Sequence, residues 1–269
     1  QLWVNGERAT RAALPKDGDF FRLAPSLAPL KNELFAGGDR FRVREGDFDP
    51  AWEHLEDVEI LITQKWVEAW LRFERFEPAT REVVCREASR FELDPAGTEY
   101  RVVNLKAALT RPGEYYYCKK ENLVYYLPRR GETIENLELV VPAINLFLVA
   151  AGTRQSPIRN LELRYLNFEY AGRDRAAVGL KHDCGVPGLP RIPNYLIRPS
   201  YLQGLSGKRP GGSPQAAVHL PGLLFFDYVT DSAVADCRIR HGNYYGIRLE
   251  RGCRNFVIAG NEIADLGGG

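Results

Sequence analysis

Three carboxylates in the second half of the chain have the residue type and spacing for acid–base chemistry. Asp265 precedes a run of three glycines, and Asp227 and Glu250 lie on strand-like segments. Cleavage of a glycosidic bond usually needs one protonated and one ionised carboxyl group, roughly 5 to 10 Å apart. Stacked strands are separated by about 4.8 Å, so equivalent positions on neighbouring strands reach that range. Asp265, Asp227 and Glu250 are therefore candidate catalytic residues; alternatively, Asp265 closes a turn and the other two are solvated charges.

The spacing between Asp227 and a basic residue suggests a second role for this acid. Asp227 and Arg251 are 24 residues apart, the spacing of the repeat described below. Side chains at the same position of adjacent repeats face each other. We therefore predict an ion pair between Asp227 and Arg251 rather than a pair of acids.

Candidate substrate-binding residues lie close to these acids in the sequence. Sugar rings have an apolar face and a rim of hydroxyl groups, so their sites combine aromatic rings with polar side chains. Residues of these types occur at a turn between two predicted strands and after a long insertion: His219, His241, Asn243, Tyr244 and Tyr245. The alternative is that the two tyrosines pack over the edge of the repeat and that His219 is structural.

A repeated pattern of aliphatic positions predicts the elements that carry these residues. Segments 231–239 and 255–263 each start with a small polar residue and have aliphatic residues three and eight positions later. Segments starting at Asn160 and, more loosely, Asn136 fit the same frame, again 24 residues apart. A fixed period of this length is typical of a solenoid. We predict an all-β chain with a right-handed parallel β-helix of about 24-residue coils; an evenly spaced β-sandwich is the alternative.

Local composition predicts the domain organisation. Residues 1–130 are β-rich with hairpin signals such as Asn5-Gly6, and predict a separate β-rich domain. Residues 131–269 hold the predicted coils, interrupted by an insertion rich in proline and glycine at about 173–213. The frame resumes 71 residues after its previous occurrence, so the insertion takes the place of one or two coils.

Composition bounds the partners. The 269-residue chain is 45% hydrophobic and has 36 basic and 35 acidic residues, a formal net charge of +1. This balance gives no electrostatic reason to expect a nucleic acid or a membrane surface as partner. No apolar run approaches the roughly 18 residues of a membrane span. We expect a monomer that is secreted or periplasmic, with its signal peptide outside this sequence.

The sequence offers no recognisable metal or cofactor motif. Its cysteines are scattered without CxxC spacing, which argues against a zinc site or a dense disulfide framework: Cys85, Cys118, Cys184, Cys237 and Cys253. Neither a serine nucleophile elbow nor a phosphate-binding loop is present. We therefore expect no metal and no cofactor.

Several motifs, taken in order, resemble landmarks of bacterial β-helix glycoside hydrolases. They are LWVNGERATRA (2–12), LEDVE (55–59), PGEYYY (112–117), LVYYLP (123–128) and GNEIADLGGG (260–269). The chain is similar to the N-terminal half of glycoside hydrolase family 141, with the family 120 β-xylosidases more distant. The resemblance implies a right-handed parallel β-helix interrupted by a β-sandwich-like domain. It also implies an α-L-fucosidase or xylan-active enzyme whose catalytic acids lie beyond the glycine-rich end, so none is carried over to a residue here.

The combined expectation is a glycoside hydrolase acting on plant cell-wall polysaccharide, seen as a fragment that folds but is inactive alone. One alternative is a non-catalytic glycan-binding or surface β-helix module. The other is a polysaccharide lyase, which needs a basic residue at its site; Lys181 and Lys208 in the insertion are the candidates.

Overall fold

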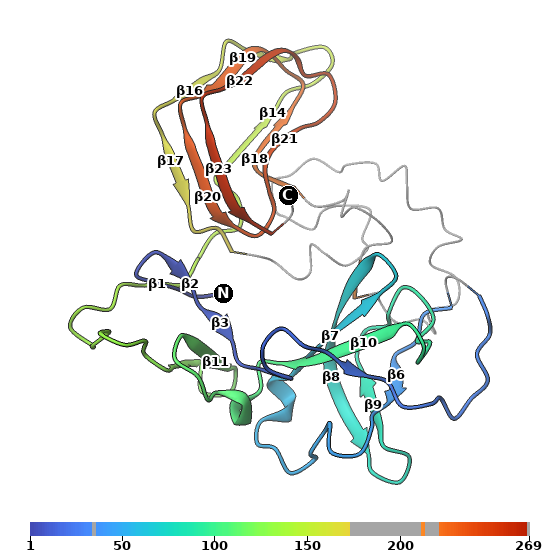
Figure 1. Cartoon of the computed structure of the whole chain (residues 1–269). Helices are drawn as coiled ribbons and strands as arrows, with labels where there is room; N and C mark the ends of the chain where they lie inside the picture. The colour runs from blue at the N-terminus through green and yellow to red at the C-terminus, as the bar shows by residue number, and fades with distance from the viewer. Residues whose placement is uncertain (34–35, 173–210, 213–220, 268–269) are drawn as a thin grey trace. The chain divides into compact units, whose positions relative to one another are not determined.

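The computed structural model describes residues 1–33, 36–172, 211–212 and 221–267. Over these residues the chain is all-β, as predicted, with two short 3-10 helices, η1 (Leu55–Asp57) and η2 (Lys106–Ala108). The described residues form two compact units (Figure 1). The antiparallel unit comprises residues 9–137 and 211–212, and the parallel unit comprises residues 1–8, 138–172 and 221–267.

The antiparallel unit holds two sheets. One has the strand order β4-β10-β7-β8-β9-β6, with β5 also pairing with β10, and the other has the order β12-β11-β3. All its pairs are antiparallel except β3 with β11. The strands are β3 (Thr10–Arg11), β4 (Ala13–Leu14), β5 (Phe21–Arg22), β6 (Arg40–Arg42), β7 (Glu59–Gln64), β8 (Val67–Glu77), β9 (Glu82–Cys85), β10 (Thr98–Val103), β11 (Glu114–Cys118) and β12 (Leu123–Tyr126).

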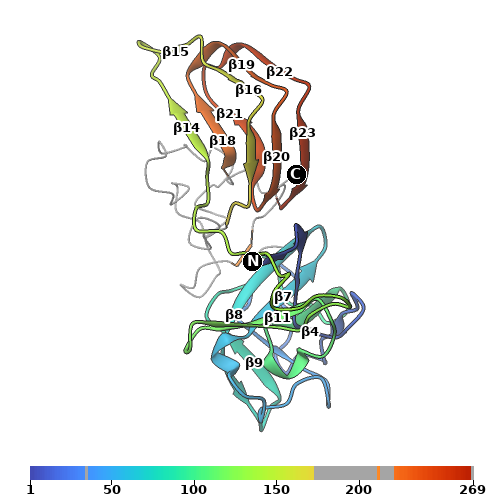
Figure 2. The same ribbon diagram turned by 90° about the vertical axis from the view of Figure 1, so that its left-hand side faces the viewer.

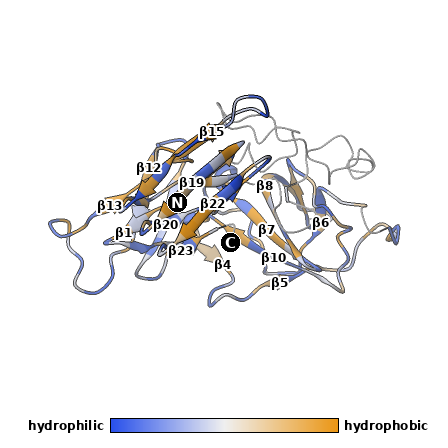
Figure 3. Ribbon diagram, turned by 90° about the horizontal axis from the view of Figure 1, so that it is seen from above, coloured by the Kyte–Doolittle hydropathy of each residue, from blue (hydrophilic) through white to orange (hydrophobic). Residues whose placement is uncertain are grey.

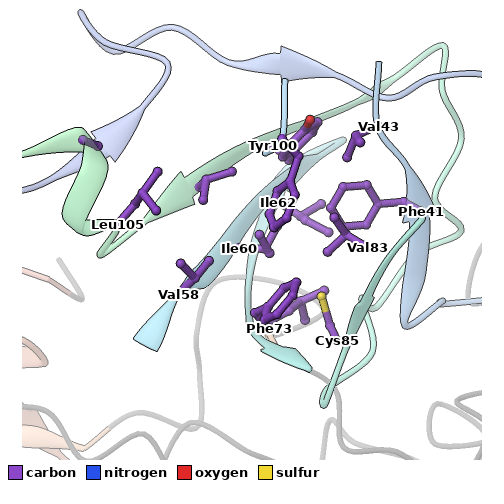
Figure 4. Packing of buried hydrophobic residues seen from close by; sticks show 14 of the residues in the cluster. Phe41, Val43, Val58, Ile60, Ile62, Phe73, Val83, Cys85, Tyr100 and Leu105 are labelled. Carbon is purple, nitrogen blue, oxygen red and sulfur yellow. The ribbon is translucent and has the colours of Figure 1, made fainter. Parts of the chain in front are cut away.

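Alternation of apolar and polar side chains builds the core of this unit. On β8, Ala69, Leu71 and Phe73 are buried while their neighbours Arg72 and Glu74 are exposed, as expected for a strand with one face against a core. Figure 4 shows how side chains from β6, β7, β8, β9 and β10 meet in this core. The core fixes the strands whose ends carry the polar residues discussed below.

The parallel unit is built mainly from three sheets whose strands all run parallel (Figures 1 and 2). Their orders are β14-β18-β21, β17-β20-β23, and a sheet in which β15, β16 and β22 all pair with β19. The strands are β14 (Leu148–Ala151), β15 (Ile158–Arg159), β16 (Glu162–Arg164), β17 (Asn167–Glu169), β18 (Gly222–Asp227), β19 (Val229–Ala235), β20 (Arg238–Gly242), β21 (Tyr245–Leu249), β22 (Arg254–Ala259) and β23 (Glu262–Leu266).

The strand register confirms two of the predicted spacings. Ser232 is opposite Phe256 and Arg238 is opposite Glu262, each pair 24 residues apart. Arg159 is opposite Thr230, which reproduces the predicted offset of 71 across the insertion. The insertion itself lies outside the described residues, apart from Gly211 and Gly212.

The earliest predicted repeat, starting at Asn136, is wrong. Strand β13 (Leu139–Val140) does not join the parallel sheets and instead pairs antiparallel with β1 (Trp3–Val4). The N-terminal hairpin offers an open strand edge there, and Asn5 extends the pairing because its backbone N–H donates to Glu138 O at 2.9 Å. The unpaired N–H and C=O groups of a strand edge can pair with any strand that lies beside them. The aliphatic pattern alone therefore did not determine the pairing partner of β13.

The Asn5-Gly6 signal correctly predicts a hairpin between β1 and β2 (Glu7–Arg8). Both turn residues have positive φ, 51° at Asn5 and 77° at Gly6, which two-residue hairpin turns of this kind require. The turn places Trp3 directly across from Arg8. The Arg8 guanidinium carbon lies 4.7 Å from the centre of the Trp3 ring.

Burial within the parallel unit differs between its middle and last strands. Phe225, Phe226 and Ile239 are fully buried, so the middle repeat has an apolar interior. On β22 and β23 the aliphatic side chains of Val257 and Ile263 remain 55% and 46% exposed, and Figure 3 shows hydrophobic stretches along both strands. Among the described strands, β22 pairs only with β19 and β23 only with β20, so fewer neighbouring strands flank these side chains than flank those of the middle strands.

Candidate functional site

Asp265, on β23, is the centre of a polar cluster in the parallel unit. His241 Nδ1 lies 2.8 Å from its carboxylate, Arg8 Nε donates at 3.0 Å, and Trp3 Nε1 donates at 3.3 Å. The Asp265 side chain nevertheless remains 37% exposed. The structure therefore combines a well-anchored carboxylate with a surface that a ligand can reach.

Electrostatics keep this carboxylate ionised. Partial burial alone raises the pKa of Asp265, but the hydrogen bonds from His241, Arg8 and Trp3 and the charge of Arg8 outweigh it and hold the pKa below its ordinary value. Hydrogen bonds and positive charge favour the anionic form of a carboxyl group. At neutral pH Asp265 is therefore a hydrogen-bond acceptor and not a proton donor.

His241, on β20, stands one repeat before Asp265 and is held from two sides. Its ring stacks on Tyr170 with centroids 4.9 Å apart and planes inclined by 13°. Trp3 packs edge-on against the His241 ring, with centroids 6.2 Å apart, and against Tyr170 at 5.6 Å. Because an ionised carboxylate only accepts hydrogen bonds, the His241 Nδ1 nitrogen carries the proton toward Asp265.

Arg8 ties the N-terminal hairpin to the end of β23. Its Nη2 donates to the backbone oxygen of Asp265 at 3.2 Å, and its Nη1 lies 3.4 Å from Asn243 Oδ1. The planar guanidinium offers five N–H groups in a fixed arrangement. Arg8 thus orients the carboxylate while presenting a cationic group at the same site.

The predicted residues Asn243, Tyr244 and Tyr245 have separate roles. Asn243 is buried and its Nδ2 donates to Ala171 O at 3.0 Å, so it supports the backbone and Arg8. Tyr244 is fully buried, which removes it as a wall for a ligand and fits the alternative of edge packing. Tyr245, on β21, is partly exposed. His219 lies outside the described residues.

The other two predicted acids are both engaged by arginine. Asp227 is 1% exposed and is held through two oxygens by Arg251, at 3.2 and 2.6 Å, which confirms the predicted ion pair. Glu250 accepts a hydrogen bond from Arg248 Nε at 2.7 Å. A bidentate arginine pair fixes the orientation of a carboxylate, and this one is buried, so we interpret Asp227 as a structural charge in place of a candidate catalytic acid.

The glycines after Asp265 serve backbone packing where the structure describes them. A Cβ atom on Gly267 would lie 2.9 Å from the carbonyl oxygen of Asn243, closer than real Cβ contacts allow. Gly267 N also donates to Gly242 O at 3.0 Å. The close approach of Gly267 is therefore to the backbone of Gly242 and Asn243.

The parallel unit also has a separate pocket of about 290 Å³. Among the described residues, its lining is mostly basic and polar and includes none of the predicted site residues. The lining residues are Arg154, Gln155, Pro157, Arg159, Tyr228, Thr230, Asp231, Gly252, Arg254 and Asn255. Asp231 is anchored there by Asn255 Nδ2 at 2.9 Å. The pocket is thus distinct from the Asp265 cluster.

Sequence reasoning missed three members of the Asp265 cluster: Trp3, Arg8 and Tyr170. Trp3 and Arg8 are separated from Asp265 by 262 and 257 positions, and no repeat relates them. The Asn5-Gly6 turn was the one usable signal, because it predicts that Trp3 and Arg8 are cross-strand neighbours. It could not show which side chain they would meet.

Comparison with known proteins supports the fold. No protein-family model matches the sequence, and no curated protein matches it. A solved structure titled "Glycoside hydrolase" superposes with a TM-score of 0.68 and 19% identity, over 97% of this chain and 46% of that protein. The chain thus spans less than half the length of this neighbour, and the two share an all-β fold. Among the described residues there is no helix with the length and apolarity needed to cross a membrane.

Proposed function

We propose that the chain is part of a glycoside hydrolase and that the Asp265 cluster binds one sugar of its substrate. The observation that carries this proposal is an ionised, partly exposed carboxylate flanked by a guanidinium, an imidazole and aromatic rings. Sugar hydroxyls donate and accept hydrogen bonds, so they suit an acceptor at Asp265 beside a donor at Arg8. The name of the structural neighbour supports the same class of reaction.

The proposed architecture of the parallel unit is a right-handed parallel β-helix. Support comes from its three parallel sheets and from the 24-residue register between β19 and β22 and between β20 and β23. In such a solenoid, binding surfaces follow the stack of repeats. His241 and Asp265, at paired positions of adjacent repeats, then form one step of a surface on which an extended glycan lies.

The Asp265 cluster acts in binding and orientation rather than in bond cleavage. Cleavage usually requires two carboxyl groups in complementary protonation states. Asp227 and Glu250 are each held by an arginine, and hydrogen bonds lower the pKa of Asp265. We propose that the acid pair of the whole enzyme lies elsewhere and that Asp265 holds a neighbouring sugar.

Plant cell-wall polysaccharides are the proposed substrates, with α-L-fucosides and xylan as the first to test, and a secreted or periplasmic monomer as the proposed form. These choices rest on the sequence motifs that resemble family 141. A non-catalytic glycan-binding module is the second candidate, because the arginine pairs remove two of the three predicted acids from acid–base chemistry.

Calorimetric titration with xylo-oligosaccharides and fucosylated oligosaccharides tests the proposal. Asp265→Asn should weaken binding roughly tenfold to a hundredfold, because hydrogen bonds to a charged group contribute about 1.5–3 kcal/mol. Glu262→Gln on the same strand is the matched control, since the Glu262 side chain is half exposed and its carboxylate pairs with Arg238 and Arg240. Sugar release should be assayed in parallel.

Three results have different meanings. Binding that depends on Asp265, together with released fucose or xylose, supports a hydrolase active in this chain. Binding without release supports the second candidate or an enzyme whose acids lie elsewhere. Equal binding by Asp265→Asn and the unaltered chain, or no binding of any of these glycans, rejects the Asp265 cluster as a sugar site.

A further inference from the structure

We propose that His54, Asp57 and Cys118, in the antiparallel unit, bind a divalent transition-metal ion, with zinc the best match. One potential ligand atom from each residue lies within 4.8 Å of the other two. His54 directly precedes η1, Asp57 ends it, and Cys118 ends β11. The scattered cysteines gave no sign of this site, because folding alone brings Cys118 to the other two residues.

The three ligand types match the chemistry of zinc. Thiolate, imidazole and carboxylate bind zinc at about 2.3, 2.0–2.1 and 2.0–2.2 Å, in tetrahedral geometry. Ligand atoms in such a tetrahedron are about 3.5 Å apart, so the observed cluster, with all separations within 4.8 Å, needs a contraction of at most about 1.3 Å. A soft thiolate beside an imidazole also disfavours magnesium and calcium, which prefer oxygen ligands.

The carboxylate of Asp57 is already oriented. Asp57 is fully buried, its Oδ2 accepts a hydrogen bond from the Tyr116 hydroxyl at 2.6 Å, and the Lys119 backbone N–H lies 3.3 Å from both oxygens. Such contacts fix the rotamer of a metal ligand and commonly surround metal sites. Since a carboxylate has about four lone-pair positions, Asp57 retains capacity for a metal.

A carboxylate also lies near the histidine. His54 Nδ1 is 3.5 Å from Glu56 Oε1, and in metal sites a carboxylate near one ring nitrogen commonly leaves the other nitrogen to the metal. His54 adopts a positive φ of 56° at the start of η1. That backbone conformation directs its side chain from a fixed turn rather than from a flexible loop.

The fourth coordination position lies outside these three side chains. The nearby Glu121 carboxylate accepts a hydrogen bond from the Tyr125 hydroxyl at 2.6 Å. Glu121 sits in the turn between β11 and β12. Glu121 or a water molecule would complete the coordination sphere.

Lys119 places an ammonium group beside Asp57. Its Nζ is 4.0 Å from Asp57 Oδ1, and its side chain is 42% exposed. A long, half-exposed lysine can swing to solvent when a divalent ion takes its place. The competing interpretation is a hydrogen-bond network closed by Lys119, with no affinity for metal.

Cobalt titration of the chelator-treated protein distinguishes the two interpretations. Binding of one Co²⁺ per chain should give a thiolate-to-cobalt charge-transfer band in the near ultraviolet and visible bands of tetrahedral cobalt. Zinc should displace the cobalt and raise Tm by roughly 5 °C or more at a hundredfold excess over Kd. Cys118→Ser should remove the charge-transfer band, and His54→Asn should weaken binding about tenfold or more.

Two controls keep the result decisive. Cys85→Ser removes a thiol that is equally buried in the same unit and should leave the spectrum unchanged. His54→Asn lies at a partly exposed position, and asparagine tolerates positive φ, so this variant tests the site even if Cys118→Ser does not fold. Absence of the charge-transfer band, or equal affinity in His54→Asn and the unaltered chain, overturns the proposal.

Discussion

Polar contacts follow different rules in the two units. In the described part of the parallel unit, hydrogen bonds or ion pairs that involve at least one side chain join residues 24 positions apart at Asp227–Arg251, Asp231–Asn255, Cys237–Asn261, Arg238–Glu262 and His241–Asp265. In the antiparallel unit, Arg11 pairs with Glu59 across 48 positions and Lys16 with Glu114 across 98. A repeating backbone therefore determines its own polar partners, whereas an antiparallel fold brings together residues that no sequence interval relates.

Equal spacing does not mean equal energy. Asp227 is 1% exposed in its pair with Arg251, whereas the side chains of Arg238 and Glu262 are 45% and 51% exposed. Solvent screens the second pair far more than the first. Variants that break the buried pair, the exposed pair and one ion pair of the antiparallel unit therefore test what sets the stability contribution of each pair. The alternatives are its burial and its position in the 24-residue repeat.

Arg251→Ala should have the largest effect. It leaves the Asp227 carboxylate buried without its bidentate partner, which costs about 3–5 kcal/mol of unfolding free energy. Urea unfolding measures this loss. Replacing both residues, Asp227→Leu with Arg251→Met, should recover most of it, because an apolar pair removes the buried charge.

A loss below about 1 kcal/mol in Arg251→Ala would mean that water reaches Asp227 and solvates it. The contrast between deep and shallow pairs would then disappear. The double variant is informative in either case, since its recovery separates the cost of an orphaned charge from the cost of lost packing.

The sequence could predict what the repeat dictates. The pairing of Asp227 with Arg251 followed from a spacing of 24, and the hairpin at Asn5-Gly6 followed from the turn residues themselves. The partners of Asp265 were only partly predictable: His241 is one repeat away, but Arg8 is 257 positions away. That contact depends on where a separate hairpin packs, which no local pattern encodes.

Two other failures have the same physical origin. Tyr244 looked like a surface aromatic because turns are usually exposed, yet it is fully buried. The aliphatic frame at Asn136 matched the repeat, but the neighbouring residues pair with Trp3 and Val4 instead. In both cases the local sequence pattern was present, but tertiary packing decided the burial of the side chain or the partner of the strand.

Glu114→Gln should have an intermediate effect, and it tests the antiparallel unit. Lys16 Nζ lies 2.7 and 2.9 Å from the two Glu114 oxygens, and the backbone N–H groups of Thr110 and Arg111 each donate at 3.1 Å. Replacing the buried carboxylate should cost about 2 kcal/mol at neutral pH, since it weakens charge-assisted hydrogen bonds.

The pH dependence of this loss has a defined sign. Burial raises the pKa of Glu114, but Lys16 and the two backbone donors outweigh it and lower the pKa below its ordinary value. The carboxylate therefore contributes stability above its unfolded-state pKa, and this contribution is lost as the pH falls through the lower folded-state pKa. The difference between the unaltered chain and Glu114→Gln should shrink in acid; a constant difference from neutral to acid would contradict this account.

Arg238→Ala should have the smallest effect, although it removes a pair with the same spacing as Asp227–Arg251. Its Nε lies 2.9 Å from Glu262, but both side chains are about half exposed, and Arg240 stands 3.7 Å from the same carboxylate. Exposed pairs contribute about 0.2–1 kcal/mol, and Arg240 compensates for part of that. Urea unfolding at low and high salt should show a small loss that salt removes. A loss as large as that of Arg251→Ala would mean that the repeat itself, and not burial, sets the strength of these pairs.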